Sequence, residues 1–228
     1  MSQGFECNVD LVLCIDATGS MGPVIGKVKE SALSFYDSLV TALASKDRIV
    51  NEDNFRVKVI VFRDYYCDGD DSMEESAFFK LPTEKSAFRS FVSSIEAKGG
   101  GDEPENALEA IAIAMNSDWV QQGTRKRHII MVWTDATAHP LEKSQEGKPS
   151  NYPSDIPDSF MELAGWWEDT QSGKMNNSAK RLIVFAPDDA PWSDVAMWSQ
   201  TIHMASKAGD GLADTDMDIV FDVLAGSI

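Results

Sequence analysis

The chain places one carboxylate and two hydroxyls at alternating positions of a single short segment. The stretch CIDATGSMG, from Cys14 to Gly22, follows an apolar run and carries Asp16, Thr18 and Ser20 among small residues. Three kinds of chemistry use such a pattern: a carboxylate that becomes phosphorylated, a loop that holds a phosphate group, and a set of oxygen ligands for a hard metal ion. The rest of the sequence decides how far each of them can be taken.

The spacing excludes a phosphate-binding loop of the Walker A type. That loop needs a glycine five positions before its Gly-Lys pair and a Ser or Thr directly after the pair. Here Met21 stands five positions before Gly26, and Val28 follows Lys27. The segment also falls within an amphipathic pattern typical of a helix, so we discard this chemistry.

The phosphorylated carboxylate stays open as an alternative. Residues 16–20 are similar to the phosphorylation motif of P-type ATPases in the haloacid dehalogenase superfamily. Thr134 ends a predicted strand, as that superfamily's second motif does, and the acidic pair at 188–189 resembles its metal-binding residues. Soluble phosphatases of the superfamily carry a second aspartate where this chain has Thr18, and they insert a flap where this chain continues into a helix.

The metal-ion chemistry accounts for more of the sequence. Mg²⁺ takes oxygen ligands and keeps several waters, which suits one carboxylate with two hydroxyls. A second apolar run, residues 128–133, is followed closely by Asp135. Ligands of parallel α/β sheets bind beyond the carboxyl ends of the strands. If the two runs are neighbouring strands, the carboxylates of Asp16 and Asp135 converge there.

Strands that alternate with helices predict an α/β domain with a mostly parallel sheet of about six strands, one an antiparallel edge strand, and helices on both faces. The predicted strands are residues 9–15, 55–62, 77–81, 128–133, 182–186 and 201–205. The predicted helices are residues 23–44, 86–95, 104–115, 158–170, 191–200 and 216–224. Residues 139–157 contain four prolines and are expected to form a long loop, and residues 68–71 a solvated acidic turn.

Composition narrows the function. With 228 residues, 43% of them hydrophobic, the chain can bury one core, and we expect a single domain over 1–228. A net charge of −17 disfavours nucleic acid and anionic membranes as partners and suits cations or basic protein surfaces. No apolar run approaches the length of a membrane span, and no secretory signal is visible. Three widely spaced cysteines favour a reduced, cytoplasmic setting.

Three stretches, taken in order, resemble the von Willebrand factor A-type (vWA) domain. Residues 16–21, Asp-x-Thr-Gly-Ser-Met, are similar to the Asp-x-Ser-x-Ser signature of its metal-ion-dependent adhesion site. The run GGGDEPENAL at 99–108 resembles the family's second, glycine-rich motif, with Asp102 where Thr is usual. Residues 133–135, Trp-Thr-Asp, resemble the third motif. The similarity extends over residues 10–228.

This resemblance implies a Rossmann-like fold and a bound divalent cation, Mg²⁺ in the first place, with Mn²⁺ or Ca²⁺ as substitutes. The residues that match the family's ligands, directly or through water, are Asp16, Thr18, Ser20, Asp102 and Asp135. A carboxylate at Asp102 would either neutralise the cation further or hold one of its waters. The stretch VFRD at 61–64, together with the glycine run, is most similar to the intracellular branch of the family, such as the vWA domains attached to alpha-kinases.

We therefore expect a non-catalytic, metal-dependent protein-interaction module inside the cell. The resemblance implies a protein partner whose acidic side chain completes the metal's coordination, and neither nucleic acid nor membrane is expected to bind. The motifs contain no Ser/His/Asp or Cys/His catalytic set. The alternative is an enzyme, a phosphotransferase or phosphatase similar to haloacid dehalogenases that uses Asp16 as its nucleophile.

Overall fold

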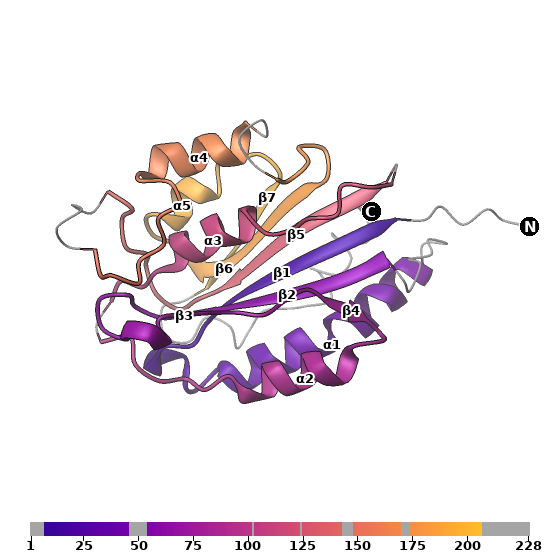
Figure 1. Ribbon diagram of the computed structural model, residues 1–228, viewed down its shortest axis with the longest axis horizontal. Helices are drawn as coiled ribbons and strands as arrows, with labels where there is room; N and C mark the ends of the chain where they lie inside the picture. The colour runs from indigo at the N-terminus through magenta and orange to yellow at the C-terminus, as the bar shows by residue number, and fades with distance from the viewer. Residues whose placement is uncertain are drawn as a thin grey trace, which may run out of the picture.

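A twisted sheet with helices on both faces forms the centre of the molecule (Figure 1). The computed structural model describes residues 7–45, 54–101, 103–123, 125–142, 148–169 and 174–206. Within these residues the sheet has seven strands in the order β3-β2-β1-β5-β6-β7, and β4 also pairs with β2. The mixed α/β class and the mostly parallel sheet predicted from the sequence are confirmed, whereas the predicted number of strands is one too low.

Five strands pair in parallel, and two short ones are antiparallel. The parallel strands are β1 (Asn8–Asp16), β2 (Phe55–Phe62), β5 (Lys126–Trp133), β6 (Lys180–Pro187) and β7 (Thr201–Ser206). The short strands β3 (Met73–Glu75) and β4 (Phe79–Leu81) share the outer edge of β2, one beside its end and the other beside its start. The extra strand is β3, which has only three residues and no apolar alternation to reveal it.

The helices form two layers. They are α1 (Ile25–Ala44), α2 (Lys85–Ser94), α3 (Ala107–Met115), α4 (Phe160–Glu168) and α5 (Trp192–Val195). Helices α1 and α2 cover one face of the sheet, and α3, α4 and α5 cover the other (Figure 1). No helix among the described residues is long and apolar enough to cross a membrane.

Helices α3 and α5 are shorter than predicted. Helix α3 begins at Ala107 and not at Pro104, because Glu105 forms a parallel bridge with Ala138 and holds the preceding residues in a loop. Helix α5 ends at Val195, well short of the predicted residue 200. The described parts of the proline-containing loop, residues 139–142 and 148–157, form no helix or strand. The helix predicted for residues 216–224 lies outside the described residues.

The central strand β1 is buried on both faces, as expected for a parallel strand between two helical layers. Leu11, Leu13 and Ile15 point into the core under α1 and α2. Val12 and Cys14 point into the core under α3. Helix α3 is itself almost wholly buried, so the loop before it is held between the sheet and the rest of the protein. This packing fixes where β1 ends and where the following loops begin.

Shortening Leu13 to alanine should lower the free energy of unfolding by about 2–5 kcal/mol, because the fully buried side chain leaves a cavity when it is truncated. Urea denaturation measures the loss. The matched control is Met161→Ala on α4, where the side chain is 82% exposed and the change should stay within about 0.5 kcal/mol. Equal losses in the two variants would contradict the described packing of β1.

Candidate functional site

The candidate site lies beyond the carboxyl ends of two neighbouring strands, at the left end of the sheet in Figure 1. Strands β1 and β5 pair in parallel, with Ile15 opposite Trp133. Asp16 is the last residue of β1, and Asp135 follows β5 by two positions. The prediction that these strands are neighbours is confirmed. Ligands of parallel α/β sheets bind at this end of the strands.

Four of the five predicted site residues form one chain of hydrogen bonds. The Thr18 hydroxyl donates to Asp16 Oδ1 at 2.7 Å, and the Ser20 hydroxyl donates to Asp135 Oδ1 at 3.0 Å. The two hydroxyl oxygens are 3.1 Å apart. Asp16, Thr18 and Asp135 are buried, and Ser20 is exposed, so the chain of oxygens opens to solvent at Ser20. The fifth predicted residue, Asp102, lies outside the described residues.

Asp16 is held by neighbours on both of its oxygens. Its Oδ1 also accepts a hydrogen bond from the Thr18 backbone N–H at 2.9 Å, and its Oδ2 accepts one from the Thr134 hydroxyl at 2.6 Å. The pKa of Asp16 is raised to about 6, chiefly by burial and slightly by the charge of Asp135, although the hydrogen bonds from Thr134 and Thr18 act to lower it. Sequence reasoning placed Thr134 here only through the enzyme alternative, and the structure makes it a fixed partner of Asp16.

These contacts weigh against Asp16 as a nucleophile. An attacking carboxylate needs a free oxygen that faces its substrate. Asp16 is fully buried and both of its oxygens accept hydrogen bonds. Between β1 and α1 the chain forms a short 3-10 turn, Gly19–Met21, where haloacid dehalogenases would place a flap. The pair Asp188 and Asp189 is exposed in the loop after β6.

The hydroxyl pair suits a hard divalent cation. The hydroxyl oxygens of Thr18 and Ser20 are 3.1 Å apart, and each has lone pairs that a cation could use. Two oxygens that bind one Mg²⁺ at about 2.1 Å and at right angles are about 3.0 Å apart. The spacing of this pair therefore matches two adjacent ligands of Mg²⁺.

The donor set is small. No group of three or more His, Cys, Asp or Glu side chains surrounds a common point within the part of the chain that the structure describes. A cation at this position would thus depend on the two hydroxyls, the carboxylates of Asp16 and Asp135, and water. That set of neutral and anionic oxygens is typical of Mg²⁺, which retains part of its hydration shell.

The glycine-rich loop packs closely against the first loop. Gly100 has a φ of +91°, and a Cβ on it would lie 2.7 Å from Thr18 Cβ. The Gly19 backbone N–H donates to the Gly99 carbonyl at 3.0 Å. Asp68 accepts hydrogen bonds from the backbone N–H of Gly100 at 3.0 Å and of Asp64 at 3.0 Å. The acidic turn predicted to be solvated is thus exposed at residues 70–71, while Asp68 anchors the glycine loop.

Arg63 connects three of the loops around the site. Its side chain is 4% exposed and donates to three backbone carbonyls, those of Ala17 at 3.0 Å, Asp71 at 2.7 Å and Glu96 at 3.0 Å. Ala17 follows Asp16 directly, and Glu96 precedes the glycine loop. The guanidinium fork therefore positions the first and second loops relative to each other. The signal in the sequence was a charged residue placed directly after the apolar strand β2.

Glu105 is a buried carboxylate beside the site that the sequence analysis did not predict as a site residue. Its side chain is 3% exposed, and its Oε1 would be 2.8 Å from a Cβ on Gly100. Burial, and after it the charges of four nearby carboxylates, raise the pKa of Glu105 to about 9; the four are Asp16, Asp64, Asp68 and Asp135. In the sequence Glu105 had the ordinary explanation of an acidic residue near a helix N-terminus.

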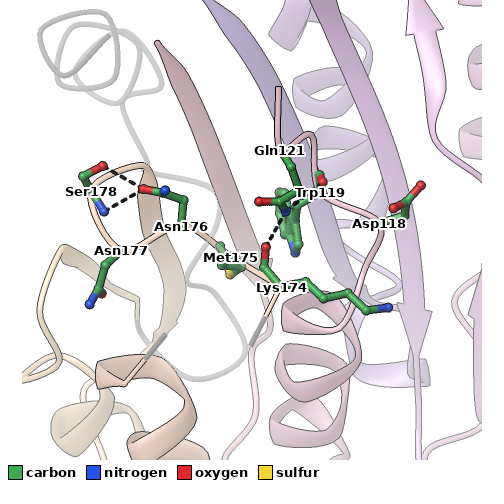
Figure 2. A pocket seen from close by; sticks show the side chains of 8 residues that line it. All are labelled: Asp118, Trp119, Gln121, Lys174, Met175, Asn176, Asn177 and Ser178. Atoms are coloured by element: carbon green, nitrogen blue, oxygen red, sulfur yellow. Dashed lines mark hydrogen bonds between the residues drawn. The ribbon is translucent and has the colours of Figure 1, made fainter. Parts of the chain in front are cut away.

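A cavity of about 660 Å³ lies at the other end of the sheet. Figure 2 shows the side chains that line it, Asp118, Trp119 and Gln121 on one side and residues 174–178 on the other. These segments precede β5 and β6, whereas Asp16 and Asp135 follow the strands β1 and β5. Gln121 donates to the Lys174 carbonyl at 2.7 Å, which joins the two sides of the cavity. The cavity is therefore separate from the candidate site.

Comparison with known proteins gives sequence matches over parts of the chain. A family model described as von Willebrand factor A domain matches residues 78–148, which include the glycine loop and Asp135. The alpha-protein kinase vwkA of Dictyostelium discoideum is 28% identical over 137 residues. That alignment covers 60% of this chain and 20% of the kinase, so the chain spans about a fifth of that relative.

Solved structures share the fold at low sequence identity. The pilus adhesin SpaC of Lactobacillus rhamnosus GG, in its open conformation, superimposes with a TM-score of 0.56 at 14% identity, over 96% of this chain and 30% of the adhesin. Proximal thread matrix protein 1 of the mussel byssus superimposes with a TM-score of 0.52 at 11% identity, over 97% of this chain and 46% of that protein. At these identities the likeness concerns the fold alone.

Replacing Arg63 by methionine should lower the free energy of unfolding by about 3 kcal/mol, because three backbone carbonyls, one of them in a buried contact, lose their charged donor. Denaturant titration measures this. The control is Lys98→Met, which removes an exposed ion pair to Asp71 beside the same loops and should leave stability nearly unchanged. A small effect of the Arg63 variant would mean that the loops do not depend on it.

In chelator, Glu105→Gln should stabilise the protein more at about pH 8 than at about pH 5.5. Because the pKa of Glu105 is raised from 4.5 to about 9, the folded protein holds a proton there that the unfolded chain releases. Wild-type stability therefore falls as pH rises through this interval, and the glutamine variant lacks that loss. Melting temperatures of both proteins across the interval test this. A constant difference between them would contradict the raised pKa.

Proposed function

We propose that this chain is a non-catalytic protein-interaction module of the von Willebrand factor A type whose binding depends on one divalent cation. The observation that carries the proposal is the hydrogen-bonded series Asp16, Thr18, Ser20 and Asp135 at the exposed end of the sheet. The two hydroxyl oxygens of this series are 3.1 Å apart, which is the spacing of adjacent Mg²⁺ ligands.

Each residue of the series has a distinct part. Thr18 and Ser20 would bind Mg²⁺ through their hydroxyl oxygens, with Mn²⁺ or Ca²⁺ as substitutes. Asp16 and Asp135 accept the protons of those hydroxyls, orient their lone pairs, and supply negative charge directly or through water. Asp102 would add a further carboxylate from the second loop. A bound Mg²⁺ would offer an open coordination position to an acidic side chain of the partner.

The partner is proposed to be a protein. The net charge of −17 makes nucleic acid and anionic membranes poor candidates, since both require clustered basic residues. A carboxylate at the cation would meet the exposed end at Ser20, where the series opens to solvent. Cys7, Cys14 and Cys67 form no disulfide with one another, which supports a reduced, cytoplasmic setting as part of the proposal.

Metal binding is tested by calorimetry with Mg²⁺ and Mn²⁺ in the wild type, in Asp16→Ala and in Asp188→Asn. We expect one site in the wild type and loss of measurable binding in Asp16→Ala, because that change removes the acceptor that orients Thr18. Asp188 is exposed in the loop after β6, and its variant should bind like the wild type. Undiminished binding by Asp16→Ala would refute the assignment.

The same samples give a stability readout. A ligand present at 100 times its Kd stabilises the native state by about 2.7 kcal/mol when the unfolded chain does not bind it. Saturating Mg²⁺ should therefore raise the melting temperature of the wild type and not that of Asp16→Ala. A pull-down from native lysate with Mg²⁺, with chelator and with the variant then tests whether binding of the partner requires the cation.

The enzyme alternative has its own experiment. An Asp-based phosphotransferase would form an acyl phosphate at Asp16 when given a small phosphate donor such as acetyl phosphate. Trapping with hydroxylamine and mass spectrometry of the peptide around residue 16 would detect it. We expect no modification, because both oxygens of Asp16 accept hydrogen bonds and the side chain is fully buried. A modified Asp16 would contradict the proposed interaction module and favour the enzyme alternative.

A further inference from the structure

We propose that Glu105 is a further residue of the cation site and holds a water of the cation's hydration shell from the second loop. The inference rests on the proposed function, since it requires a cation beside Thr18 and Ser20. The sequence pattern predicted only Asp102 as the carboxylate that the glycine-rich motif contributes to the cation site. We add Glu105 from the same motif.

Glu105 lies where the three loops of the site meet. Its backbone N–H donates to the Thr137 carbonyl at 3.1 Å, and its carbonyl accepts from the His139 N–H at 2.8 Å. These two bonds join it to the loop that follows Asp135. Its side chain lies against Gly100, because a Cβ there would be 2.8 Å from Glu105 Oε1. Glu105 is thereby fixed relative to all three motifs.

The same position on Gly100 also touches the first loop. The Cβ that would be 2.8 Å from Glu105 Oε1 would be 2.7 Å from Thr18 Cβ. Glu105 and Thr18 thus flank the small space that the missing Gly100 side chain leaves. A bulkier residue at position 100 would separate the carboxylate from the loop that carries the two hydroxyls. The glycine therefore keeps the Glu105 carboxyl close to the candidate cation position.

The Glu105 carboxyl has an unused oxygen. Within the described residues its Oε2 has no hydrogen-bond partner although the side chain is 3% exposed. An unpaired buried carboxyl is costly to the fold. Its retention beside a group of oxygen ligands indicates that a bound species supplies the missing partner.

A water-mediated role agrees with the geometry better than direct ligation. In the described part of the chain, Glu105 does not converge with Asp16 and Asp135 on a common point. Mg²⁺ keeps several waters, and carboxylates that accept hydrogen bonds from metal-bound groups strengthen metal binding by about 10–100-fold. Glu105 Oε2 is therefore assigned as the acceptor for one such water.

The test compares Mg²⁺ and Mn²⁺ affinity, by calorimetry, in the wild type, Glu105→Gln and Glu103→Gln. Glu105→Gln keeps the shape of the side chain and removes its charge, and we expect it to weaken Mg²⁺ binding at least about tenfold. Glu103 is exposed two positions earlier in the same loop, so its variant controls for the loss of one charge at a distance. Glu105→Asp keeps the charge on a shorter side chain and should bind with intermediate affinity.

The melting temperature in chelator gives a second readout. A residue that only supports the fold would lower it when changed, whereas Glu105→Gln should raise it or leave it unchanged while weakening metal binding. If Glu105→Gln fails to fold, weakened binding by the folded Glu105→Asp variant supports the inference, and wild-type affinity in that variant overturns it. If the wild type binds Mg²⁺ and both Glu105 variants bind it with the same affinity, this inference is overturned and the proposed function is not. Absence of Mg²⁺ binding by the wild type overturns the proposed function and this inference together.

Discussion

The arrangement of the site depends on the buried guanidinium of Arg63. It donates to one carbonyl in each of three loops, and these loops carry or precede the residues that form the site. A fork of fixed donors sets both distance and orientation, which a flexible ammonium group would not do. The first and second loops are consequently placed by the protein itself. A cation would enter a site whose oxygens already have their positions, so little of its binding energy is needed to order the chain.

The positive charge of Arg63 also stands among many negative ones. Asp16, Asp64, Asp68 and Asp135 are near enough to Glu105 for their charges to raise its pKa. A fold selected for stability alone would replace several of these carboxylates with amides or apolar groups. Their concentration at one end of the sheet is therefore an arrangement that weakens the isolated protein and favours the binding of positive charge.

The sequence was sufficient for the five parallel strands and, to within one residue, for the positions at which they end. Continuous apolar runs such as those of β1 and β5 leave little choice of structure, and the residues that follow them, Asp16 and Asp135, must then meet if the strands are neighbours. Local pattern also placed Thr18 and Ser20. What it could not supply were contacts between loops distant in sequence, such as Thr134 with Asp16 and Asp68 with Gly100. The start of α3 was misplaced for the same reason, because the pairing of Glu105 with Ala138 overrides the local preference of Pro104.

The two short strands on β2 have a consequence for how the molecule meets others. A long exposed strand offers a row of unpaired N–H and C=O groups to any second chain. Here the outer edge of β2 is already occupied by β3 and β4, each three residues long, and the exposed side chains there include Glu74, Glu75 and Lys80. The strands at this edge are too short, and the side chains beside them too highly charged, for another polypeptide to extend the sheet here. Recognition of another chain by addition of a strand is therefore disfavoured on that flank, and so is self-assembly through this edge.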